Sequence, residues 1–471
     1  MNKILIANRG EIAVRIIRAC KEMNIKTVAV YSEADKDSLH TRLADEAICI
    51  GPANSNKSYL NYKNIIEAAY ITGSDSIHPG FGFLSENSQF AKICEESNIK
   101  FIGPSYEVIK LMGNKSNAKE MMEKAGVPVV PGSKGSIKSI NDAKKTAKEI
   151  GYPIMLKAAA GGGGKGIRIV NDESELESSY NIVKQEAMIS FKDDEIYMEK
   201  FIQNPRHVEI QILADEHGNV IHLGERDCTV QRKNQKVIEE TPSTAIDDKL
   251  REKMGEAAIK AAKKVGYTSC GTIEFLVDKN KNFYFMEMNT RIQVEHGITE
   301  ERTGIDIVKE QIRIAAGEKI KIKQKEVEFR GHVIECRINA ENPEKKFRPS
   351  PGKITGLIFP GGNGIRIDTA IYNGYTIPPY YDSMIAKVIV HGTNRNEALS
   401  KMKRALEELV IDGVETNIDF LFDIIKKPDF IRGKFDTSFV ESEVWKKGEK
   451  VNIITASWEG VGILWNKRVA Y

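Results

Sequence analysis

Five polar side chains stand on alternate positions of one short segment in the second half of the chain. They are Glu287, Asn289, Arg291, Gln293 and Glu295. In an extended chain alternate side chains share one face, so these groups would line one side of a strand. The apolar residues that would point the other way and bury are Met286, Met288, Ile292 and Val294. A face of carboxylate, amide and guanidinium groups predicts the floor of a site for charged ligands.

A further carboxylate is expected to face this segment. Residues 270–278 are typical of a strand and residues 279–282 of a turn. A two-residue loop at Asn280 and Lys281 would place Glu274 directly opposite Glu287, where like charges repel. A divalent cation between them would remove the repulsion, and oxygen-only ligands favour Mg²⁺ or Mn²⁺. The alternative is a slipped register in which one of the two glutamates faces solvent.

A run of glycines at residues 161–166 follows a predicted strand that ends at Lys157. The run matches the dinucleotide-binding spacing, but a helix follows where that fold needs a strand ending in an acid. Ile167 stands where a P-loop requires lysine, which excludes that motif as well. We therefore predict a flexible loop whose backbone amides close over phosphates, with Lys157 as a fixed positive charge. A plain surface turn is the alternative, but successive glycines sacrifice much entropy without a role.

Residues 224–240 are dense in charge, and a solvated pair of strands would explain them equally well in isolation. Their basic members are Arg226, Arg232, Lys233 and Lys236. Because the charged groups of residues 274–295 are expected nearby, we predict that these cations help to hold anions. Arg337 stands in an apolar strand context and needs a partner or a ligand. Lys115 follows a helix N-cap residue and, taken alone, would be an ordinary solvated lysine.

The composition of the 471 residues is that of an ordinary globular protein, with 41% hydrophobic and 29% charged residues. The formal net charge is +3 with both signs interleaved, which argues against a dedicated nucleic-acid or membrane surface. The six cysteines form no C-x-x-C pair, so reduced thiols are expected. The N-terminus lacks a signal-peptide core, and no apolar run approaches the roughly 18 residues of a membrane helix. We expect a cytoplasmic protein.

Alternating short strands and helices over residues 1–113 predict a parallel α/β domain. A second domain is expected at residues 114–330, with a smaller α/β piece at about residues 131–203. From residue 331 the chain changes to short strands, Pro/Gly turns and one helix, which indicates a compact α+β domain that ends at residue 441. Residues 442–471 would be a subunit contact or a disordered tail. The expected helices cover residues 12–23, 111–125, 175–189, 307–316 and 396–409.

Eight segments carry a resemblance to a known family. They are residues 6–13, 78–87, 157–166, 204–211, 287–296, 331–339, 349–355 and 378–384. Together they closely resemble biotin carboxylase, a member of the ATP-grasp superfamily of ligases, and the match spans about residues 2–440. The resemblance implies a Rossmann-like N-terminal domain, an ATP-grasp central domain with a mobile Gly-rich lid, and an α+β C-terminal domain.

The resemblance also implies an activity. ATP and bicarbonate would carboxylate the biotin of a separate biotin carboxyl carrier protein through carboxyphosphate, giving carboxybiotin, ADP and phosphate. The sequence has no Ala-Met-Lys-Met-like biotin acceptor and no room for a carboxyltransferase domain, so a separate carboxyltransferase subunit is expected, together with a homodimer. The reaction would be the first half-reaction of acetyl-CoA carboxylase in fatty acid biosynthesis. The alternative is the same half-reaction in a pyruvate, 2-oxo acid or other acyl-CoA carboxylase.

The resemblance assigns roles to individual residues. ATP would contact Lys115, Lys157, Gly163, Gly164, Glu199, Lys200, Phe201, Ile202, His207, Gln231, Asn234, Glu274 and Glu287. The Mg²⁺ or Mn²⁺ ligands would be Glu274, Glu287 and Asn289. Bicarbonate would bind to Lys236, Arg291, Gln293, Val294 and Glu295. The catalytic groups would be Lys236, Arg291, Glu295 as general base, and Arg337, which would bind biotin and stabilise its enolate.

Two positions depart from the family pattern. Asn234 stands where some members carry histidine, and Gly297 replaces a common proline and is expected to loosen the backbone beside Glu295. Three other classes remain as alternatives. Another ATP-grasp ligase should lack the set of Arg291, Glu295 and Arg337, and an NAD-dependent oxidoreductase is disfavoured by the context of the glycine run. A non-catalytic nucleotide-binding protein would have no reason to keep three glutamates together.

Overall fold

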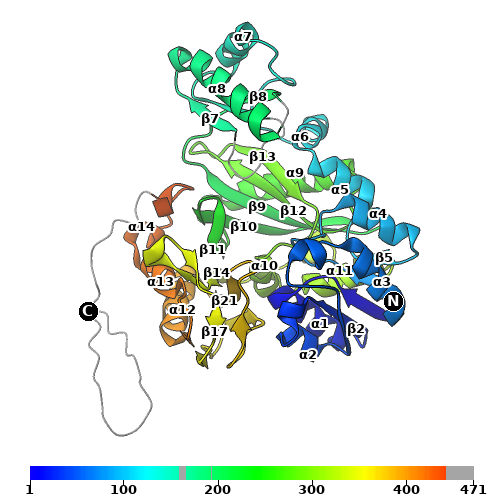
Figure 1. Ribbon diagram of the computed structural model, residues 1–471. Coiled ribbons are helices and arrows are strands. Elements are labelled where there is room, and N and C mark those ends of the chain that lie inside the picture. The colour runs from blue at the N-terminus through cyan, green and yellow to red at the C-terminus, as the bar shows by residue number, and fades with distance from the viewer. Residues whose placement is uncertain (159–165, 192–193, 442–471) are drawn as a thin grey trace.

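The computed structural model describes residues 1–158, 166–191 and 194–441. At the N-terminus a parallel five-stranded sheet has the order β3-β2-β1-β4-β5 and is flanked by helices (Figure 1). Its strands are β1 Lys3–Ile6, β2 Lys26–Tyr31, β3 Glu46–Cys49, β4 Ser76–His78 and β5 Lys100–Phe101. The helices are α1 Gly10–Glu22, α2 Leu39–Leu43, α3 Tyr62–Thr72, α4 Ser88–Glu96 and α5 Tyr106–Gly113.

The helix expected over residues 111–125 is two helices. The first is α5, and the second is α6, Lys115–Lys124. Asn114 separates them because its backbone is extended and its side chain accepts a hydrogen bond from the backbone N–H of Asn117 at 3.0 Å. This N-cap begins a new helix where the apolar pattern alone predicts a continuous one. Lys115 is therefore the first residue of α6.

A small antiparallel sheet stands apart at the top of Figure 1. Its order is β7-β6-β8, with β6 Ile154–Ala158, β7 Ile167–Val170 and β8 Ile196–Lys200. Two helices, α7 Ile140–Ile150 and α8 Glu173–Phe191, pack against it. Ile154, Leu156 and Met198 are fully buried against these helices, which gives this piece its own core. Neither α7 nor β7 was predicted from the sequence, and three of the four β7 residues are exposed.

The centre of the molecule is an antiparallel eight-stranded sheet with the order β13-β12-β9-β10-β11-β14-β21-β19. Its strands are β9 Arg206–Ala214, β10 Val220–Arg232, β11 Gln235–Thr241, β12 Ser269–Val277, β13 Phe283–Asn289, β14 His332–Asn339, β19 Ile365–Thr369 and β21 Met384–Gly392. The pairing of β11 with β14, in which Ile238 faces Cys336, makes the sheet continuous past residue 331. The sequence changes at residue 331 to short strands and Pro/Gly turns, but the large sheet continues across that point.

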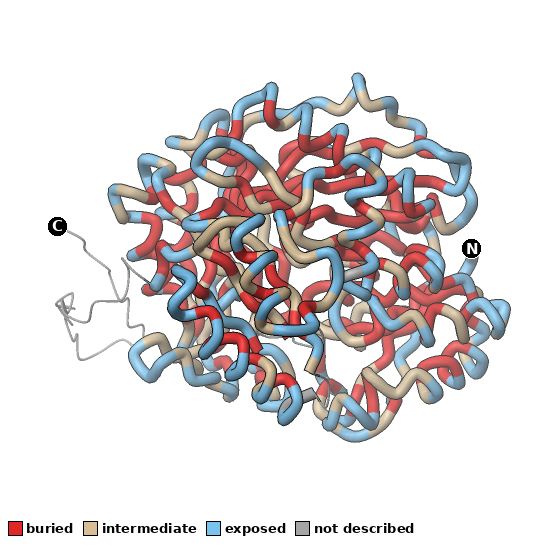
Figure 2. The backbone as a smooth tube through the Cα atoms, turned by 90° about the horizontal axis from the view of Figure 1, so that it is seen from above, coloured by how far each residue is buried: buried red, intermediate tan, exposed pale blue. Residues whose placement is uncertain are grey.

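Helices cover one face of this sheet and supply its apolar core. The helix α9, Asp248–Lys264, lies on β9 and β10, while α12 Arg395–Glu408 and α13 Ile418–Lys426 lie on β14, and α12 also on β21. The remaining helices are α10 His296–Thr303, α11 Ile307–Ala315 and α14 Pro428–Ile431. The short strands are β15 Glu341–Asn342, β16 Arg348–Pro349, β17 Gly352–Lys353, β18 Gly356–Ile358, β20 Thr376–Ile377 and β22 Val410–Asp412. Figure 2 shows the buried segments in the interior, with exposed turns around them. None of the described helices is both long and apolar enough to cross a membrane.

Candidate active site

The second face of the large sheet is polar although it is buried. Along β9, Val208, Ile210 and Ile212 belong to the apolar core that includes α9. The alternate residues His207, Glu209 and Gln211 point to the other face and are also buried. A strand that buries both faces but carries charge on only one of them needs partners there, and the neighbouring strands provide them.

The hairpin of β12 and β13 pairs Glu274 with Glu287, as predicted. The predicted two-residue loop is wrong. Asp278 N–H instead donates to Asn282 O at 2.9 Å, and the turn between them places Lys281 at a positive φ of 63°. An irregularity between Glu274 and Phe275 then shifts the register by one residue and restores the pairing of the two glutamates.

The long alternating strand predicted for residues 287–295 is wrong, because β13 ends at Asn289. Glu86 holds the chain beyond that point: it accepts hydrogen bonds from Thr290 N at 3.1 Å and from Arg291 Nε at 2.8 Å. A turn follows, and Glu295 precedes α10 as its N-cap residue. All five alternate polar residues nevertheless line one cavity of about 2300 Å³, as do Met286 and Val294, which were expected to bury.

Cations and an acid from the small sheet line one part of this cavity. Lys157 on β6 forms an ion pair with Glu199 on β8, and Lys119 Nζ lies 3.1 Å from the same carboxylate. Burial favours the neutral acid, but the two lysines outweigh it and lower the pKa of Glu199. Phe201 and Ile202 line the cavity directly after β8, whereas the ammonium of Lys200, another lining residue, donates to Gly151 O and Tyr152 O at 2.9 and 2.8 Å.

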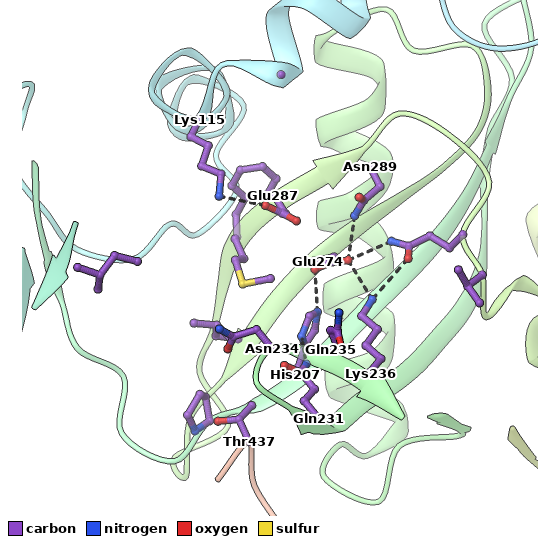
Figure 3. A pocket seen from close by; sticks show the side chains of 18 of the residues that line it. Lys115, His207, Gln231, Asn234, Gln235, Lys236, Glu274, Glu287, Asn289 and Thr437 are labelled. Atoms are coloured by element: carbon purple, nitrogen blue, oxygen red, sulfur yellow. Dashed lines mark hydrogen bonds and ion pairs between the residues drawn. The ribbon is translucent and has the colours of Figure 1, made fainter. Parts of the chain in front are cut away.

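Lys115, at the start of α6, also lines the cavity. Its Nζ lies 3.4 Å from Glu287 Oε2, and its side chain is 77% exposed (Figure 3). Glu287 is the more exposed of the paired glutamates at 38%, whereas Glu274 is 5% exposed. The two carboxylates therefore stand side by side on facing strands, one at the surface of the cavity and one at its base.

His207 connects the base of the cavity with the β10–β11 turn. Its Nε2 lies 2.8 Å from Glu274 Oε2, and its Nδ1 accepts a hydrogen bond from Gln231 Nε2 at 2.7 Å (Figure 3). Asn234 lines the same part of the cavity. The turn needs positive φ at both central residues, and Asn234 adopts φ 62°, which asparagine tolerates better than most side chains.

Lys236 is the centre of the buried charges in this cavity. Its Nζ donates to Glu209 Oε2 at 2.7 Å, Glu274 Oε1 at 3.1 Å, Gln293 Oε1 at 3.4 Å and Glu295 Oε1 at 2.6 Å. An ammonium carries three N–H donors, so four acceptors must share it. We call Glu209, Lys236, Glu274, Glu295 and Arg337 the Lys236 cluster.

Glu295 is ionised by its surroundings. Arg337 Nη2 lies 2.9 Å from Glu295 Oε2, and Arg337 Nε donates to Glu239 Oε1 at 2.6 Å. Burial alone would raise the pKa of Glu295, but Lys236, Arg337 and Arg226 together hold it well below its usual range. The partner that the sequence required for Arg337 is thus a pair of carboxylates from two neighbouring elements.

Asn289 and Gln293 complete the base of the cavity. Asn289 Nδ2 donates to Glu274 Oε1 at 2.8 Å, and Gln293 Nε2 donates to the same oxygen at 3.0 Å. Arg291 Nη2 in turn donates to Asn289 Oδ1 at 3.1 Å. The structure therefore brings most of the predicted metal-binding and bicarbonate-binding residues into one connected group of hydrogen bonds, which contains Lys236, Glu274, Asn289, Arg291, Gln293 and Glu295 but neither Glu287 nor Val294.

Two neighbours of the site were missed, and two of the four predicted cations, Arg226 and Lys233, do not line the cavity. Glu209 lies within a recognised motif, and its alternation with His207 and Gln211 could have identified it. Glu86, which binds Arg291, also lies within a recognised motif, residues 78–87, but no alternation of polar residues marks it there. Arg226 was expected to help hold anions, but it is fully buried and donates to Glu209 Oε1 at 2.5 Å and Gln211 Oε1 at 2.6 Å, away from the cavity.

Three further expectations concern the glycine run, the C-terminal tail and Gly297. Gly163 and Gly164 lie outside the described residues, as does the tail from residue 442. Gly297 does not form a loose segment, because it is buried in the first turn of α10. A Cβ there would lie 2.5 Å from Ile389 Cδ1, so the side chain of Ile389 fills the space that a larger residue would need.

Three family models match the chain in succession. Biotin carboxylase, N-terminal domain, matches residues 1–109, and Carbamoyl-phosphate synthase L chain, ATP binding domain, matches residues 114–323. Biotin carboxylase C-terminal domain matches residues 335–442.

Curated relatives match nearly the whole chain. It is 58% identical over 443 residues to Biotin carboxylase 1 of Bacillus subtilis (strain 168), and the match covers 94% of this chain and 98% of the relative. It is 53% identical over 440 residues to one of the pyruvate carboxylase subunits of Methanothermobacter thermautotrophicus, and that match covers 93% of this chain and 89% of the relative.

Solved structures agree with this similarity. A Campylobacter jejuni biotin carboxylase complex has a TM-score of 0.89 and 54% identity, and the match covers 93% of this chain and 98% of that one. The biotin carboxylase domain dimer of Hydrogenobacter thermophilus 2-oxoglutarate carboxylase, solved with MgADP, ADP and bicarbonate, has a TM-score of 0.88 and 52% identity. That match covers 95% of this chain and 99% of the other.

Proposed function

The chain belongs to the biotin carboxylase family, and we propose that it uses ATP and bicarbonate to carboxylate the biotin of a separate biotin carboxyl carrier protein. The observation that carries this proposal is the position of Lys236. Its ammonium lies 3.1 Å from Glu274, at the metal end of the cavity, and 2.6 Å from Glu295, at the bicarbonate end. A group shared by both ends is where a phosphoryl group and its nucleophile must meet.

ATP would lie in the part of the cavity that is lined by Lys115, Lys157 and residues 199–202. Lys115 and Lys157 would contact its phosphates, and residues 199–202 would hold the adenine, with His207, Gln231 and Asn234 beside the ribose or phosphates. Glu274 and Glu287 are register partners with Asn289 nearby, so their carboxylate and amide oxygens suit Mg²⁺ or Mn²⁺. The bound ion would neutralise charge on the phosphate oxygens. The MgADP bound by the Hydrogenobacter relative supports a site for a magnesium nucleotide in this chain.

Bicarbonate would bind among Lys236, Arg291, Gln293, Val294 and Glu295. One of its oxygens attacks the γ-phosphorus of ATP, the bond to the bridging oxygen breaks, and ADP leaves carboxyphosphate behind. Glu295 accepts the proton of bicarbonate, because Lys236 and Arg337 keep it ionised. An anion that draws Lys236 toward itself also weakens the pairing of Glu295, which makes the carboxylate a stronger base when it is needed.

Arg337 would act on the second substrate. Carboxyphosphate releases CO₂ beside biotin N1, and loss of the N1 proton places negative charge on the ureido oxygen of biotin. A guanidinium 2.9 Å from Glu295 is close enough to the bicarbonate end to stabilise that enolate next to the CO₂. Glu239 holds the same guanidinium through Nε at 2.6 Å and Nη2 at 2.5 Å, which keeps it in place beside Glu295.

The carboxyl acceptor is chosen by a separate carboxyltransferase. We propose that the chain catalyses the first half-reaction of acetyl-CoA carboxylase as a cytoplasmic homodimer. The pyruvate carboxylase and 2-oxoglutarate carboxylase relatives favour one alternative, the same half-reaction in a 2-oxo acid carboxylase. Identification of the biotinylated protein and the carboxyltransferase that co-purify with the chain distinguishes the two.

The proposed reaction is tested by ADP release with and without its two small substrates. We expect ATP hydrolysis that requires bicarbonate and is stimulated by free biotin. ATP turnover that ignores both bicarbonate and biotin would contradict the proposal. Assays in CO₂-depleted buffer provide the control, because dissolved CO₂ otherwise supplies bicarbonate.

A further inference from the structure

A second layer of charged side chains lies directly behind the bicarbonate end of the cavity. The register of the sheet pairs Arg337 on β14 with Lys387 on β21, and Lys387 with Asp368 on β19. Directly paired residues project from the same face, so these three stand in one row. Two cations side by side in such a row repel each other, and the arrangement therefore needs a reason beyond packing.

Lys387 is fully buried and does not line the cavity. Its Nζ donates to the backbone carbonyl of Val294 at 2.7 Å, and it lies 3.3 Å from Glu11 Oε1 and 3.6 Å from Asp368 Oδ2. Burial of an ammonium costs several kcal/mol unless hydrogen bonds and counter-ions compensate. Here the shortest contact of that ammonium is to the backbone of the turn that precedes Glu295.

The two carbonyl groups of this turn are both held on the side away from the cavity. Gln293 O accepts hydrogen bonds from His296 Nδ1 at 2.8 Å and His296 N at 3.3 Å, while Val294 O accepts from Lys387. Neither peptide bond is cis, so each N–H points opposite to the carbonyl of its own peptide. The N–H groups of Val294 and Glu295 therefore point to the side on which these residues line the cavity.

We infer that Lys387 is a positioning residue for bicarbonate. It fixes the Val294–Glu295 peptide so that the N–H groups of Val294 and Glu295 and the carboxylate of Glu295 contact the anion together. This inference rests on the proposed function. Lys387 touches no substrate; it acts through the backbone of the turn.

The counter-ions of Lys387 connect this turn with two distant parts of the chain. Asp368 comes from the edge strand β19, and Glu11 comes from α1 within the first recognised motif. Burial raises the pKa of Glu11 to about 7 even beside Lys387. Burial acts on Asp368 in the same sense, but Lys387 and Arg366 outweigh it and keep its pKa below the usual range. Asp368 is thus the permanently charged partner of Lys387.

The test compares steady-state kinetics of the wild type with those of Lys387→Met. Bicarbonate-dependent ATP hydrolysis of the wild type with free biotin is measured first, and its absence would refute the proposed function rather than this inference. Once that activity is established, we expect Lys387→Met to raise KM for bicarbonate roughly 10- to 100-fold. KM for ATP should change less than about two-fold, because the ATP contacts lie elsewhere. An unchanged KM for bicarbonate overturns the inference.

A double variant separates positioning from stability. Lys387→Met leaves Glu11 without the cation beside it, whereas Asp368 keeps its pair with Arg366 at 2.8 Å, so we combine Lys387→Met with Glu11→Gln to remove both charges. The double variant should regain thermal stability and keep the raised KM for bicarbonate. If KM returns to the wild-type value together with stability, Lys387 is only structural and the inference fails.

Lys401→Met is the matched control. Like Lys387, Lys401 donates from Nζ to a backbone carbonyl at 2.7 Å, but its acceptor is His391 O on β21, and neither Lys401 nor His391 lines the cavity. We expect its KM for bicarbonate to equal that of the wild type. A rise like that of Lys387→Met would show that loss of a lysine that donates to a backbone carbonyl has the effect wherever it lies, which overturns the specific role of Lys387.

Discussion

The two faces of strands β10 and β11 both bury charge, but in different arrangements. On the face toward α9 and α12, Glu225 accepts hydrogen bonds from Arg251 Nε at 2.6 Å and Nη2 at 2.8 Å, and Glu240 accepts one from Arg395 Nε at 2.7 Å. We call these the structural pairs. On the opposite face the single ammonium of Lys236 lies 2.6 to 3.4 Å from four acceptors.

The difference appears in the acids themselves, which are all buried. Burial opposes ionisation at Glu225, yet Arg251 and Arg302 lower its pKa. At Glu209 burial prevails over Lys236 and Arg226, and the pKa is raised. Glu225 has two guanidinium groups for one carboxylate, whereas Glu209 lies beside the acids Glu274 and Glu295, whose negative charges add to the effect of burial and offset Arg226 and Lys236. Each acid of the structural pairs has its own cation, whereas the Lys236 cluster holds three acids against two cations, an excess of negative charge that a metal ion would neutralise.

The largest expected effect is the loss of the proposed base. Glu295→Gln keeps the shape of the side chain but cannot accept the proton of bicarbonate, so kcat should fall by about 10²- to 10⁴-fold. Binding of MgATP, measured by calorimetry, should stay close to that of the wild type. If MgATP affinity is lost instead, Glu295 belongs to the nucleotide site and its assignment as base is wrong.

Removal of the cation from one of the structural pairs should lower the stability of the protein without changing its affinity for substrates. Arg251→Met leaves Glu225 buried without its main partner, and we expect a loss of about 3 kcal/mol in the free energy of unfolding in urea. The KM values for ATP and bicarbonate should be unchanged in the folded variant. The control is Arg404→Met, which breaks an exposed pair with Glu408 and should cost less than about 1 kcal/mol. A rise in KM for bicarbonate in Arg251→Met would erase the distinction between the two faces.

Glu240 gives the structural face a pH dependence with a definite sign. Burial opposes ionisation, but His332 and Arg395 lower the pKa of Glu240 from its ordinary value of 4.5 to about 2. A lowered pKa contributes stability above the unfolded value, and this contribution is lost as pH falls from 4.5 toward 2. Unfolding in urea should therefore show the largest difference between wild type and Glu240→Gln at about pH 5–7. The difference should shrink below about pH 4.5, and a constant difference across this range would refute the assignment.

The smallest expected effect is at the exposed edge of the cavity. Lys115 is 77% exposed, so Lys115→Met should leave thermal stability unchanged. Loss of a phosphate contact should raise KM for ATP by about 10-fold. Lys92→Met, which removes an exposed lysine of α4 that pairs with Glu96, is the control and should change neither quantity. Equal KM values for ATP in the two variants would remove Lys115 from the nucleotide site.

Much of the candidate site could be predicted because its residues are local in sequence. The alternation from Glu287 to Glu295 identified residues that do line one cavity, even though the strand ends at Asn289. The pairing of Glu274 with Glu287 was correct for a similar reason, since a hairpin offers few registers and a bulge offset the longer turn.

The remainder depends on long-range contacts that local patterns do not contain. The pairing of β11 with β14 joins residues about a hundred positions apart and brings Arg337 next to Glu239, while the packing of α10 on β14 brings Glu295 to the same guanidinium. The misplacement of Arg226 has the same origin, because only the packed sheet reveals that it faces Glu209 in the interior. Charge in a sequence shows that a partner is required, and the fold decides whether that partner is a ligand or another side chain.

The most direct test of the proposed chemistry follows oxygen atoms from bicarbonate. The wild-type protein is supplied with ATP, Mg²⁺, free biotin and bicarbonate labelled with ¹⁸O, and the phosphate product is analysed by mass spectrometry. If bicarbonate attacks the γ-phosphorus beside Lys236 and Glu295, each phosphate formed should carry one oxygen from bicarbonate. Phosphate that contains oxygen from water alone would contradict this mechanism, because water would then be the nucleophile.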